Sequence, residues 1–143
     1  MDDYEGLKLD KQLCFPLYAC AREVVRLYKP YLDPIGLTYT QYIVMLVLWE
    51  RDPLSVKELG ERLYLDSGTL TPLLKKLEAQ GLLTRTRSAA DERSVNISLT
   101  SLGEQLRERA VGIPRSMSGC LPLSEEEEEA LSGLLKKILG AVR

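Results

Sequence analysis

The chain has 143 residues, of which 45% are apolar and 28% are charged, and its formal net charge is −2. This size and composition predict one compact domain with its own core, and the near-neutral charge argues against a general polyanion binder while allowing a local basic patch. The absence of histidine excludes histidine-based acid–base catalysis and most zinc sites, and three cysteines without a C-x-x-C pair disfavour a disulfide-stapled secreted fold.

Nothing in the sequence predicts a membrane segment or a secretory signal. The longest apolar run, residues 42–49, is far shorter than the roughly 20 residues that a membrane span needs. No basic segment precedes an apolar stretch near the first residue, and no glycine-rich phosphate loop is found. We therefore expect a cytoplasmic protein that uses no membrane, metal or cofactor.

Helix signals dominate the first 81 residues, with short breaks between them. The sequence predicts helices at about residues 13–28, 38–50, 55–63 and 66–80. Lys29-Pro30 is expected to end the first helix, because a proline disfavours helical backbone in the residue before it. Thr38 and Ser55 open capping boxes at the starts of the second and third helices. Gly81 is the expected C-terminal stop of the fourth helix.

The period of the pattern changes after Gly81. Residues 82–87 and 95–99 alternate apolar and polar side chains on either side of the polar turn SAADERS, which predicts a β-hairpin. A helix capped by Thr100 or Ser101 follows, breaks near residues 112–114, and gives way to a last helix capped by Ser124. The five glutamates at 125–129 then lie at a helix N-terminus, where carboxylates stabilise the helix dipole, rather than forming an acidic tail.

This order of elements predicts a fold that is mainly α with a small β-hairpin. Two helices joined by a tight turn and followed by a hairpin form a winged helix-turn-helix. We assign the whole chain to a single domain, with a DNA-binding lobe at about residues 30–103 and dimerisation helices at about 7–30 and 104–143. The long amphipathic terminal helices have no partner within so small a unit, so we expect a homodimer.

The candidate recognition helix is the fourth helix, DSGTLTPLLKKLEAQ. Its leucines recur at helical spacing and are expected to face the core. Its first turn offers hydroxyl groups that can reach phosphates and base edges, and its exposed side offers two cations. The predicted DNA-contacting residues of this segment are Ser67, Thr69, Thr71, Lys75, Lys76 and, further along the chain, Arg87. Residues 67–87 carry four basic residues and one acidic residue, so the segment is positive within an acidic chain.

The tip of the hairpin offers Arg93, and an arginine on a protruding wing suits the narrow, electronegative minor groove. Asp91 precedes it by two residues and is expected to fix its guanidinium. The alternative is that these cations are ordinary surface residues, because winged helices also mediate contacts between proteins.

Cys14 lies in the stretch DKQLCFPLYACA, residues 10–21. Pro16 lacks an N–H and is tolerated only in the first turn of a helix, so the helix is expected to start near Gln12 or Leu13, with Cys14 in its first turn. Free N–H groups and the positive end of the helix dipole stabilise a thiolate there, and the thiolate is the form that reacts with peroxides. The alternative is a buried, unreactive cysteine that only packs.

Two tyrosines share a helical face with Cys14. Tyr18 lies one turn away, about 40° around the helix. Tyr28 is also about 40° from that face but roughly 21 Å along the axis, so any chemical role beside Cys14 requires the Tyr28 of a partner subunit. The alternative is that both tyrosines simply line a dimer interface.

The other two cysteines differ in their surroundings. Cys20 lies about 120° around the helix from Cys14 and about 9 Å along it, too far for a disulfide, and is interpreted as a packing residue. Cys120 lies in the irregular joint SMSGCLPLS beside Gly119, a mobile place for a resolving thiol. An incidental joint cysteine remains the alternative.

The segments LYLDSGTLTPLLKKLEAQGLLTRTRS and DERSVNISLTSLG resemble the MarR family of winged-helix regulators. The most recognisable pattern of that family is a D-x-R wing followed by L-T and a glycine, which here are Asp91, Arg93, Leu99-Thr100 and Gly103. Within the family, LDKQLCFPLYAC, YTQYIVMLVLWE and LYLDSGTLTPLLK are similar to the organic hydroperoxide regulators, the OhrR type. The resemblance covers nearly the whole chain and is weakest beyond residue 112.

The resemblance implies a homodimeric repressor, not an enzyme, that senses organic hydroperoxides and binds double-stranded, pseudo-palindromic operator DNA. It implies DNA contacts by the recognition helix and by the Asp91–Arg93 wing. It places Tyr18 near the thiol within one chain, with Tyr28 and Tyr39 donating hydrogen bonds from the other. It further implies that oxidised Cys14 forms an intersubunit disulfide with Cys120, which cellular thiols reduce.

Two other functions compete with this reading. A MarR-type repressor gated by a small aromatic ligand in the dimer cleft would use Cys14 only for packing. A thiol peroxidase of the thioredoxin kind would need a βαβ sheet core, whereas this chain offers one hairpin.

Overall fold

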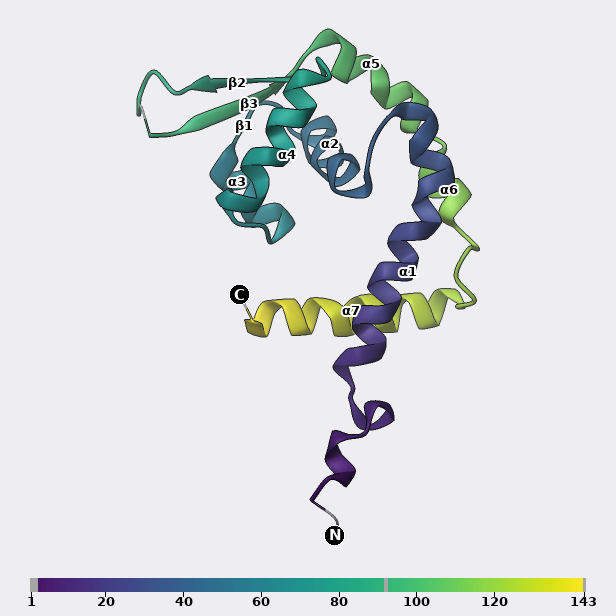
Figure 1. Cartoon of the computed structure of the whole chain (residues 1–143). Coiled ribbons are helices and arrows are strands. Elements are labelled where there is room, and N and C mark those ends of the chain that lie inside the picture. The colour runs from purple at the N-terminus through teal and green to yellow at the C-terminus, as the bar shows by residue number, and fades with distance from the viewer. Residues whose placement is uncertain (1–2, 92, 143) are drawn as a thin grey trace.

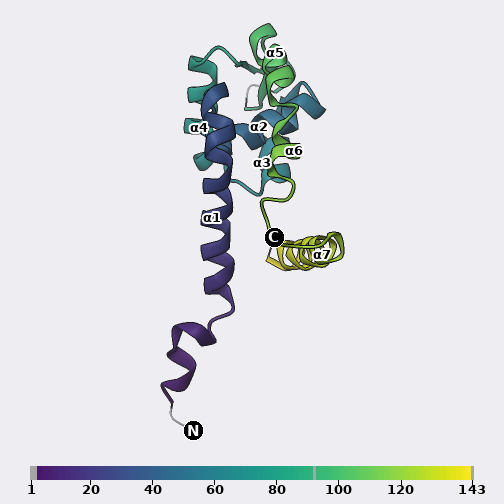
Figure 2. The ribbon, with the colours of Figure 1, turned by 90° about the vertical axis from the view of Figure 1, so that its right-hand side faces the viewer.

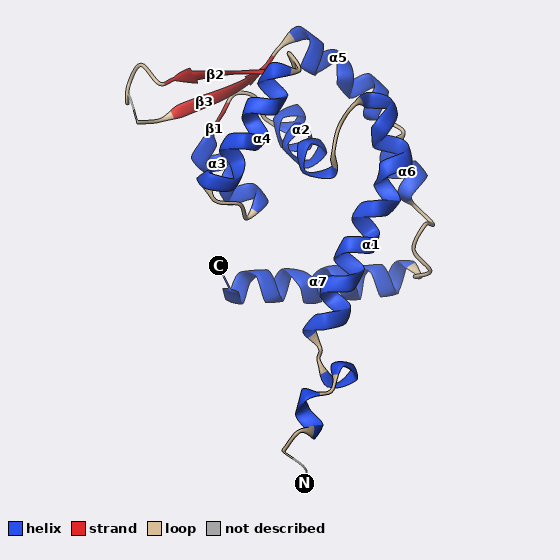
Figure 3. Ribbon diagram, in the orientation of Figure 1, coloured by secondary structure: helices blue, strands red, loops and turns tan. Residues whose placement is uncertain are grey.

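The computed structural model of the chain describes residues 3–91 and 93–142. Its helices are α1 (Cys14–Leu32), α2 (Tyr39–Glu50), α3 (Val56–Leu63), α4 (Ser67–Ala79), α5 (Ser101–Ala110), α6 (Ile113–Met117) and α7 (Glu125–Val142). Short 3₁₀ turns lie at η1 (Glu5–Leu7), η2 (Leu9–Lys11) and η3 (Asp33–Ile35). The strands β1 (Leu54–Ser55), β2 (Leu83–Arg87) and β3 (Val95–Leu99) form one antiparallel sheet in the order β1-β3-β2. The fold predicted from the sequence is confirmed (Figure 3).

The helix starts follow the predicted capping residues at four helices, and Asp66 caps α4 in addition. At each of five helices, a side-chain oxygen of the residue before the helix accepts a hydrogen bond from a backbone N–H in the first turn, which satisfies one otherwise unpaired donor. The capping residues are Thr38, Ser55, Asp66, Thr100 and Ser124. Gln41 completes the box at α2 by accepting from the Thr38 N–H at 2.9 Å, whereas Ser55 caps α3 without a reciprocal bond.

The predicted end of the first helix at Lys29-Pro30 is wrong, because α1 continues through Pro30 to Leu32. Pro30 lies in the last turn, where its missing N–H removes only one helical hydrogen bond. The carbonyl of Lys29 still accepts from the Asp33 N–H, and Leu32 is 2% exposed within the core. Burial of Leu32 therefore outweighs the local signal of the proline.

The core lies between the helices of one winged-helix lobe and the inner face of its small sheet. Every buried apolar residue lies between Leu32 and Ile113, so the core reaches beyond the predicted lobe of 30–103 into α5 and α6. The side chains with the least exposure are Val44, Met45, Leu59, Leu70, Leu77 and Ile97. Strand β1 was not predicted, because two residues are too short for a sequence pattern; Leu54 and Ser55 pair with Ile97 and Asn96 of β3.

The structure explains why a glycine stands at position 103, after Leu99-Thr100. A Cβ built on Gly103 would lie 2.0 Å from the carbonyl oxygen of Leu82, so no larger residue fits where α5 crosses the start of the wing. The indole N–H of Trp49 donates to the Gly103 carbonyl at 2.9 Å and joins α2 to the same place. The glycine is thus required by a close approach of two backbones.

The terminal helices extend away from the lobe. The N-terminal half of α1 projects beyond it while the hairpin projects from its other side, and α7 lies apart at the end of the segment that follows α6 (Figures 1 and 2). Helix α7 contains no buried residue. No helix in the described part of the chain is long and apolar enough to cross a membrane.

Candidate DNA interface and redox site

Helix α4 presents the predicted DNA-contacting face to solvent. The carboxylate of Asp66 accepts from the Thr69 N–H at 2.7 Å and fixes the start of the helix, while Leu70, Leu74 and Leu77 are buried and orient it. The predicted DNA-contacting residues of this helix are all exposed: Ser67, Thr69, Thr71, Lys75 and Lys76. The helix thus keeps its leucines inside and its hydroxyls and ammonium groups outside, as the spacing predicts.

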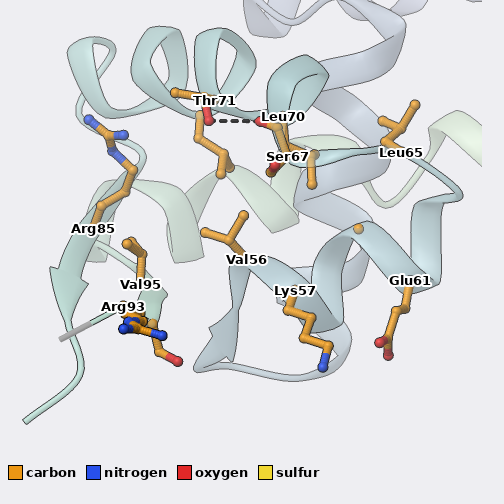
Figure 4. Close-up of a pocket in the computed structure, with 13 residues that line it drawn as sticks. Val56, Lys57, Glu61, Leu65, Ser67, Leu70, Thr71, Arg85, Arg93 and Val95 are labelled. Atoms are coloured by element: carbon orange, nitrogen blue, oxygen red, sulfur yellow. Dashed lines mark hydrogen bonds between the residues drawn. The ribbon is translucent and has the colours of Figure 1, made fainter. Parts of the chain in front are cut away.

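Thr71 differs from the other two hydroxyl residues. Its Oγ1 donates to the carbonyl oxygen of Ser67 at 2.7 Å (Figure 4). The hydroxyl proton of Thr71 is therefore used within the helix, and the prediction that it serves as a donor to DNA needs correction. Its oxygen can still accept a hydrogen bond.

A groove of about 590 Å³ separates α4 from α3 and the wing. Ser67 and Thr71 of α4 line one wall, and Arg85 and Arg93 line the side of the wing (Figure 4). Lys57, near the start of α3, lies at the third side. Sequence reasoning missed Lys57 and Arg85 as individual candidates. The only local signal for either was its charge, because their convergence on one groove depends on how three elements pack.

Glu78 joins the recognition helix to the wing. Its carboxylate accepts from the Arg85 guanidinium at 3.2 Å and from the Arg85 backbone N–H at 3.0 Å. The guanidinium hydrogen bond, followed by the backbone hydrogen bond, lowers the pKa of Glu78 below its ordinary range. The pair therefore holds the end of α4 against β2 with the carboxylate charged.

Asp91 supports the wing tip in a way that differs from the prediction. Its Oδ1 accepts from the backbone N–H of Arg93 at 3.0 Å, and its Oδ2 accepts from the Ser94 hydroxyl at 3.4 Å. It therefore caps the turn instead of holding the Arg93 guanidinium, because a short carboxylate readily binds the backbone two residues on. Arg93 and Arg87 are exposed, and Glu92 lies outside the described residues.

Cys14 is the first residue of α1 and is exposed. The preceding Leu13 supplies no side-chain cap, and no acidic side chain lies in the first turn, so the positive end of the helix dipole is left to the thiol. Tyr18 is 59% exposed one turn further along, and the Arg22 guanidinium lies 5.6 Å from the centre of its ring. The prediction of a first-turn cysteine is confirmed, and the alternative of a cysteine buried in its own chain is wrong.

Three tyrosines form a cluster where α1 meets α2. The ring centres of Tyr28 and Tyr39 are 4.9 Å apart, and that of Tyr42 lies 5.8 Å from Tyr28. Burial, followed by the neighbouring Tyr28 phenol, raises the pKa of Tyr39 and of Tyr42 above the ordinary value. These phenols therefore stay protonated and able to donate. Tyr28 lies fourteen residues after Cys14 in one continuous helix, so the cluster and the thiol of one chain are about 21 Å apart along the axis.

The two other cysteines are also exposed. Cys20 is not part of the core, so the packing role predicted for it would need the surface of another molecule. Cys120 lies between α6 and α7, where its thiol donates to the Ser116 carbonyl at 3.2 Å. The preceding Gly119 has a φ of +85°, a conformation that glycine adopts without strain.

The described residues contain no group of three or more cysteine, aspartate or glutamate side chains arranged to hold a metal ion. The candidate site presents the exposed thiols, the phenols and the cations around the groove.

Comparisons with known proteins agree with this geometry. A family model described as transcriptional regulator SarA/Rot matches residues 26–109. The chain is 52% identical, over 136 residues, to the organic hydroperoxide resistance transcriptional regulator of Bacillus subtilis (strain 168), with 95% of this chain and 92% of that protein covered.

Among solved structures, reduced AbfR bound to DNA matches with a TM-score of 0.80 and 36% identity, covering 97% of this chain and 98% of that chain. The disulfide form of AbfR, a protein of Staphylococcus epidermidis, matches with a TM-score of 0.66 and 38% identity, covering 94% of this chain and 95% of that chain. Overoxidised AbfR bound to DNA matches almost as well, with a TM-score of 0.78 and 36% identity, so the arrangement of helices in this chain is closer to DNA-bound AbfR than to the disulfide form.

Proposed function

Because the chain belongs to the MarR family of winged-helix transcriptional regulators, in the group of organic hydroperoxide resistance regulators, we propose that it is a homodimeric repressor that organic hydroperoxides release from its operator. In the reduced state, each copy places one recognition helix in a half-site of a pseudo-palindromic operator, with the wings in flanking minor grooves. Oxidation of Cys14, followed by an intersubunit disulfide with Cys120, ends DNA binding. Cellular thiols restore the reduced form.

The exposed face of α4 and the wing support DNA binding. Hydroxyl groups of Ser67 and Thr69 lie at the start of the helix, where base edges and phosphates are reached, and Lys75 and Lys76 follow with charge for the backbone. Arg93 extends from the capped turn towards a minor groove. The solved complex of reduced AbfR with DNA has the same fold, and this chain matches it better than it matches the disulfide form.

Exposed apolar side chains on the terminal helices support a homodimer. On α7, Leu134 is 59% and Ile138 47% exposed, and no residue of this helix is buried. On α1, Phe15 and Leu17 are each 43% exposed beside Cys14. Apolar surface on two projecting helices is costly in water, and pairing with the same helices of a second copy removes it.

Cys14 at the start of α1 is the observation that carries the proposal. The thiolate attacks one oxygen of the hydroperoxide, the O–O bond breaks, the sulfur becomes sulfenic acid, and the alkoxide leaves as an alcohol after protonation. The sulfur loses two electrons and the peroxide gains them. The apolar side chains of Phe15 and Leu17 beside the thiol favour an organic peroxide over hydrogen peroxide.

The tyrosine cluster serves the thiol of the other chain in this proposal. The distance along α1 separates Tyr28 from the Cys14 of its own chain, whereas two α1 helices that pair antiparallel would bring each cluster to the opposite thiol. The phenol hydroxyls of Tyr28 and Tyr39 then donate hydrogen bonds to the sulfur or to the peroxide, and Tyr18 does so within the chain.

Cys120 completes the switch. Its thiol condenses with the sulfenic acid of the partner's Cys14, which forms the disulfide and releases water. The bridge requires Cα atoms within about 7 Å, so it must draw the joint before α7 of one copy towards α1 of the other. The separation of the recognition helices then no longer matches the half-sites. AbfR, which resembles this chain over nearly its whole length, has been solved in a disulfide form.

The test combines a non-reducing gel with DNA binding. The probe is a duplex selected from a random-sequence pool by the reduced protein, and the oxidant is cumene hydroperoxide. Oxidised wild type should run as a covalent dimer and lose the duplex, and dithiothreitol should reverse both changes. Cys14→Ser should bind the duplex normally and ignore the peroxide. Cys120→Ser should give no covalent dimer and accumulate sulfenic or sulfinic acid.

Cys20→Ser is the matched control, because this cysteine is also exposed on α1 but has no role in the proposal. It should behave as wild type in both assays. Release of the Cys14→Ser variant at wild-type doses of peroxide would falsify the sensor role. Release by a phenolic ligand, with no response to peroxide, would instead support the ligand-gated repressor.

A further inference from the structure

The segment that joins α1 to α2, residues 33–37, is held by backbone hydrogen bonds to the end of α1; we call it the elbow. The Gly36 N–H donates to the Asp33 carbonyl at 3.0 Å, and the Leu37 N–H donates to the Leu32 carbonyl at 3.2 Å. Gly36 has a φ of +71°. Leu32, at the end of α1, and Leu37, at the end of the elbow, are buried and only 2% and 4% exposed. The elbow therefore follows any movement of the C-terminal end of α1.

Two side chains from distant parts of the sequence hold the elbow. The side-chain amide of Gln80 donates to the Gly36 carbonyl at 2.9 Å, and the guanidinium of Arg109 donates to the Pro34 carbonyl at 2.7 Å. Gln80 is the C-cap residue of the recognition helix, and Arg109 lies in the last turn of α5. Two elements of the DNA-binding lobe are thus bonded to carbonyls two residues apart in the segment that follows α1.

Gln80 lies where several DNA-reading elements meet. The next residue, Gly81, has a φ of +78° and turns the chain from α4 into the wing. The Thr100 hydroxyl donates to the Gly81 carbonyl at 2.6 Å, and the Thr100 N–H donates to the Leu82 carbonyl at 3.1 Å. The end of α4, the start of β2 and the start of α5 therefore form one hydrogen-bonded junction, and Gln80 connects it to the elbow.

The thiol is too far from this junction to act on it directly. Eighteen residue steps separate Cys14 from Leu32 in α1, which is about 27 Å along the helix. Movement of α1 as a body is one way in which a change at Cys14 can reach the recognition helix. The long helix runs from the projecting N-terminal end to the edge of the lobe, where the elbow begins (Figures 1 and 2).

We propose that Gln80 and Arg109 are positioning residues that pass a displacement of α1 to the recognition helix and to α5. The inference rests on the proposed redox function and deepens it by naming the link between sensor and DNA reader. When the disulfide draws α1 out of place, the carbonyls of Pro34 and Gly36 move with it, and the two donors carry the ends of α4 and α5 along.

Both hydrogen bonds suit transmission better than folding. They are exposed, so each contributes little to the stability of the lobe, whose core is packed without them. Gln80 also lies thirteen residues after Ser67, about 20 Å along α4, and so outside the face proposed to contact DNA. Loss of either side chain is therefore separable from loss of folding and of DNA contacts.

The experiment measures how strongly oxidation changes DNA binding. The full-length dimers of wild type, Gln80→Ala, Arg109→Ala and the double variant are titrated against the selected duplex before and after cumene hydroperoxide. Where wild type loses about a hundredfold in affinity on oxidation, the double variant should lose less than about tenfold. Its reduced affinity should stay within about threefold of wild type, and its Cys14 should oxidise and form the disulfide at the wild-type rate.

Matched controls come from the same helix, α5, with Gln105 one turn before Arg109 and Arg107 on the opposite face. Gln105→Ala and Arg107→Ala remove an amide and a guanidinium that are exposed and make no hydrogen bond or ion pair within the described residues, and both should respond as wild type. Gln80→Glu keeps the length of the side chain but cannot donate to the Gly36 carbonyl. It should therefore lose coupling as Gln80→Ala does.

A double variant that releases the duplex as fully as wild type would overturn the inference and assign the coupling to the packing of α1 and α4 against α2. A wild-type response in Gln80→Glu would exclude the hydrogen bond as the link. If oxidised wild type itself kept the duplex, the proposed redox function would fail first, and the inference with it.

Discussion

The winged-helix lobe and the terminal helices of this chain dispose of their apolar surface in opposite ways. The lobe buries most of its leucines, together with Val44, Val47 and Ile97, within one core, whereas α7 buries none of its residues. The residues proposed to contact DNA are therefore placed by one chain alone. The thiol and the phenols proposed to act on it lie about 21 Å apart in one chain, so their meeting depends on a second copy. The proposed DNA contacts are arranged within one chain, whereas the proposed peroxide-sensing site needs residues of two chains.

The largest expected effect tests whether the lobe is complete within one chain. Gly103→Ala should destabilise the protein by more than about 4 kcal/mol, because its Cβ would lie 2.0 Å from the Leu82 carbonyl and the two backbones must separate. Urea unfolding followed by circular dichroism measures the effect.

Gly133→Ala is the control on the other side of the comparison. Nothing lies within 4 Å of a Cβ at Gly133, and alanine favours the helix by up to about 1 kcal/mol. Equal stabilities of the two variants would show that the backbone at Gly103 does not approach the Leu82 carbonyl closely.

The next effect concerns the terminal helices. Leu134→Asp places a carboxylate on the exposed apolar face of α7 and should weaken dimerisation at least about a hundredfold, roughly 2.7 kcal/mol, while each lobe stays folded. Sedimentation equilibrium measures the dimer. Leu102→Asp, at a 54% exposed leucine of α5, should leave dimerisation unchanged. A dimer that tolerates Leu134→Asp would place the interface elsewhere.

A smaller effect is confined to the wing. Arg93→Ala should weaken binding of the selected duplex by about 1–3 kcal/mol at fixed salt, because it removes one groove contact. Dimerisation and the reaction of Cys14 with peroxide should not change, since the wing lies at the far side of the lobe from α1 (Figure 1). Unchanged affinity would mean that Arg93 is an ordinary surface residue.

The smallest expected effect tests whether the peroxide-sensing site combines Cys14 of one chain with Tyr28 of the other. In a mixed dimer, one chain carries Cys14→Ser and Tyr28→Phe together, and its partner is wild type. The remaining Cys14 then lacks the phenol across the interface and should oxidise about tenfold more slowly, roughly 1.4 kcal/mol, as expected for one lost hydrogen bond to a charged group. Stopped-flow kinetics with cumene hydroperoxide gives the rate.

Splitting the same two changes provides the control. With Cys14→Ser on one chain and Tyr28→Phe on the other, the remaining Cys14 faces an intact Tyr28 and should oxidise at the normal rate. The reverse order of the two rates would show that Tyr28 acts within its own chain. Equal rates would remove Tyr28 as a contributor.

Much of the fold and of the candidate site followed from local pattern. Thr38, Ser55 and Thr100 cap helices where their sequence context predicts, because an N-cap depends only on the residues of one turn. Cys14 lies in the first turn of α1 because Pro16 restricts where a helix can begin. The same reasoning failed at Pro30, where burial of Leu32 in a distant core extended the helix.

The sequence by itself determined the order of elements, the inward leucines of α4, the turn that carries Arg93 and the position of Cys14 at a helix start. Each depends on residues a few positions apart, whose spacing is visible in the chain. Only the tertiary structure decided that Lys57 and Arg85 line one groove with Arg93, and that Gln80 bonds the elbow 44 positions earlier in the chain. Contacts of that kind arise when separate elements pack against a shared core, and no local spacing records which side chains the packing brings together.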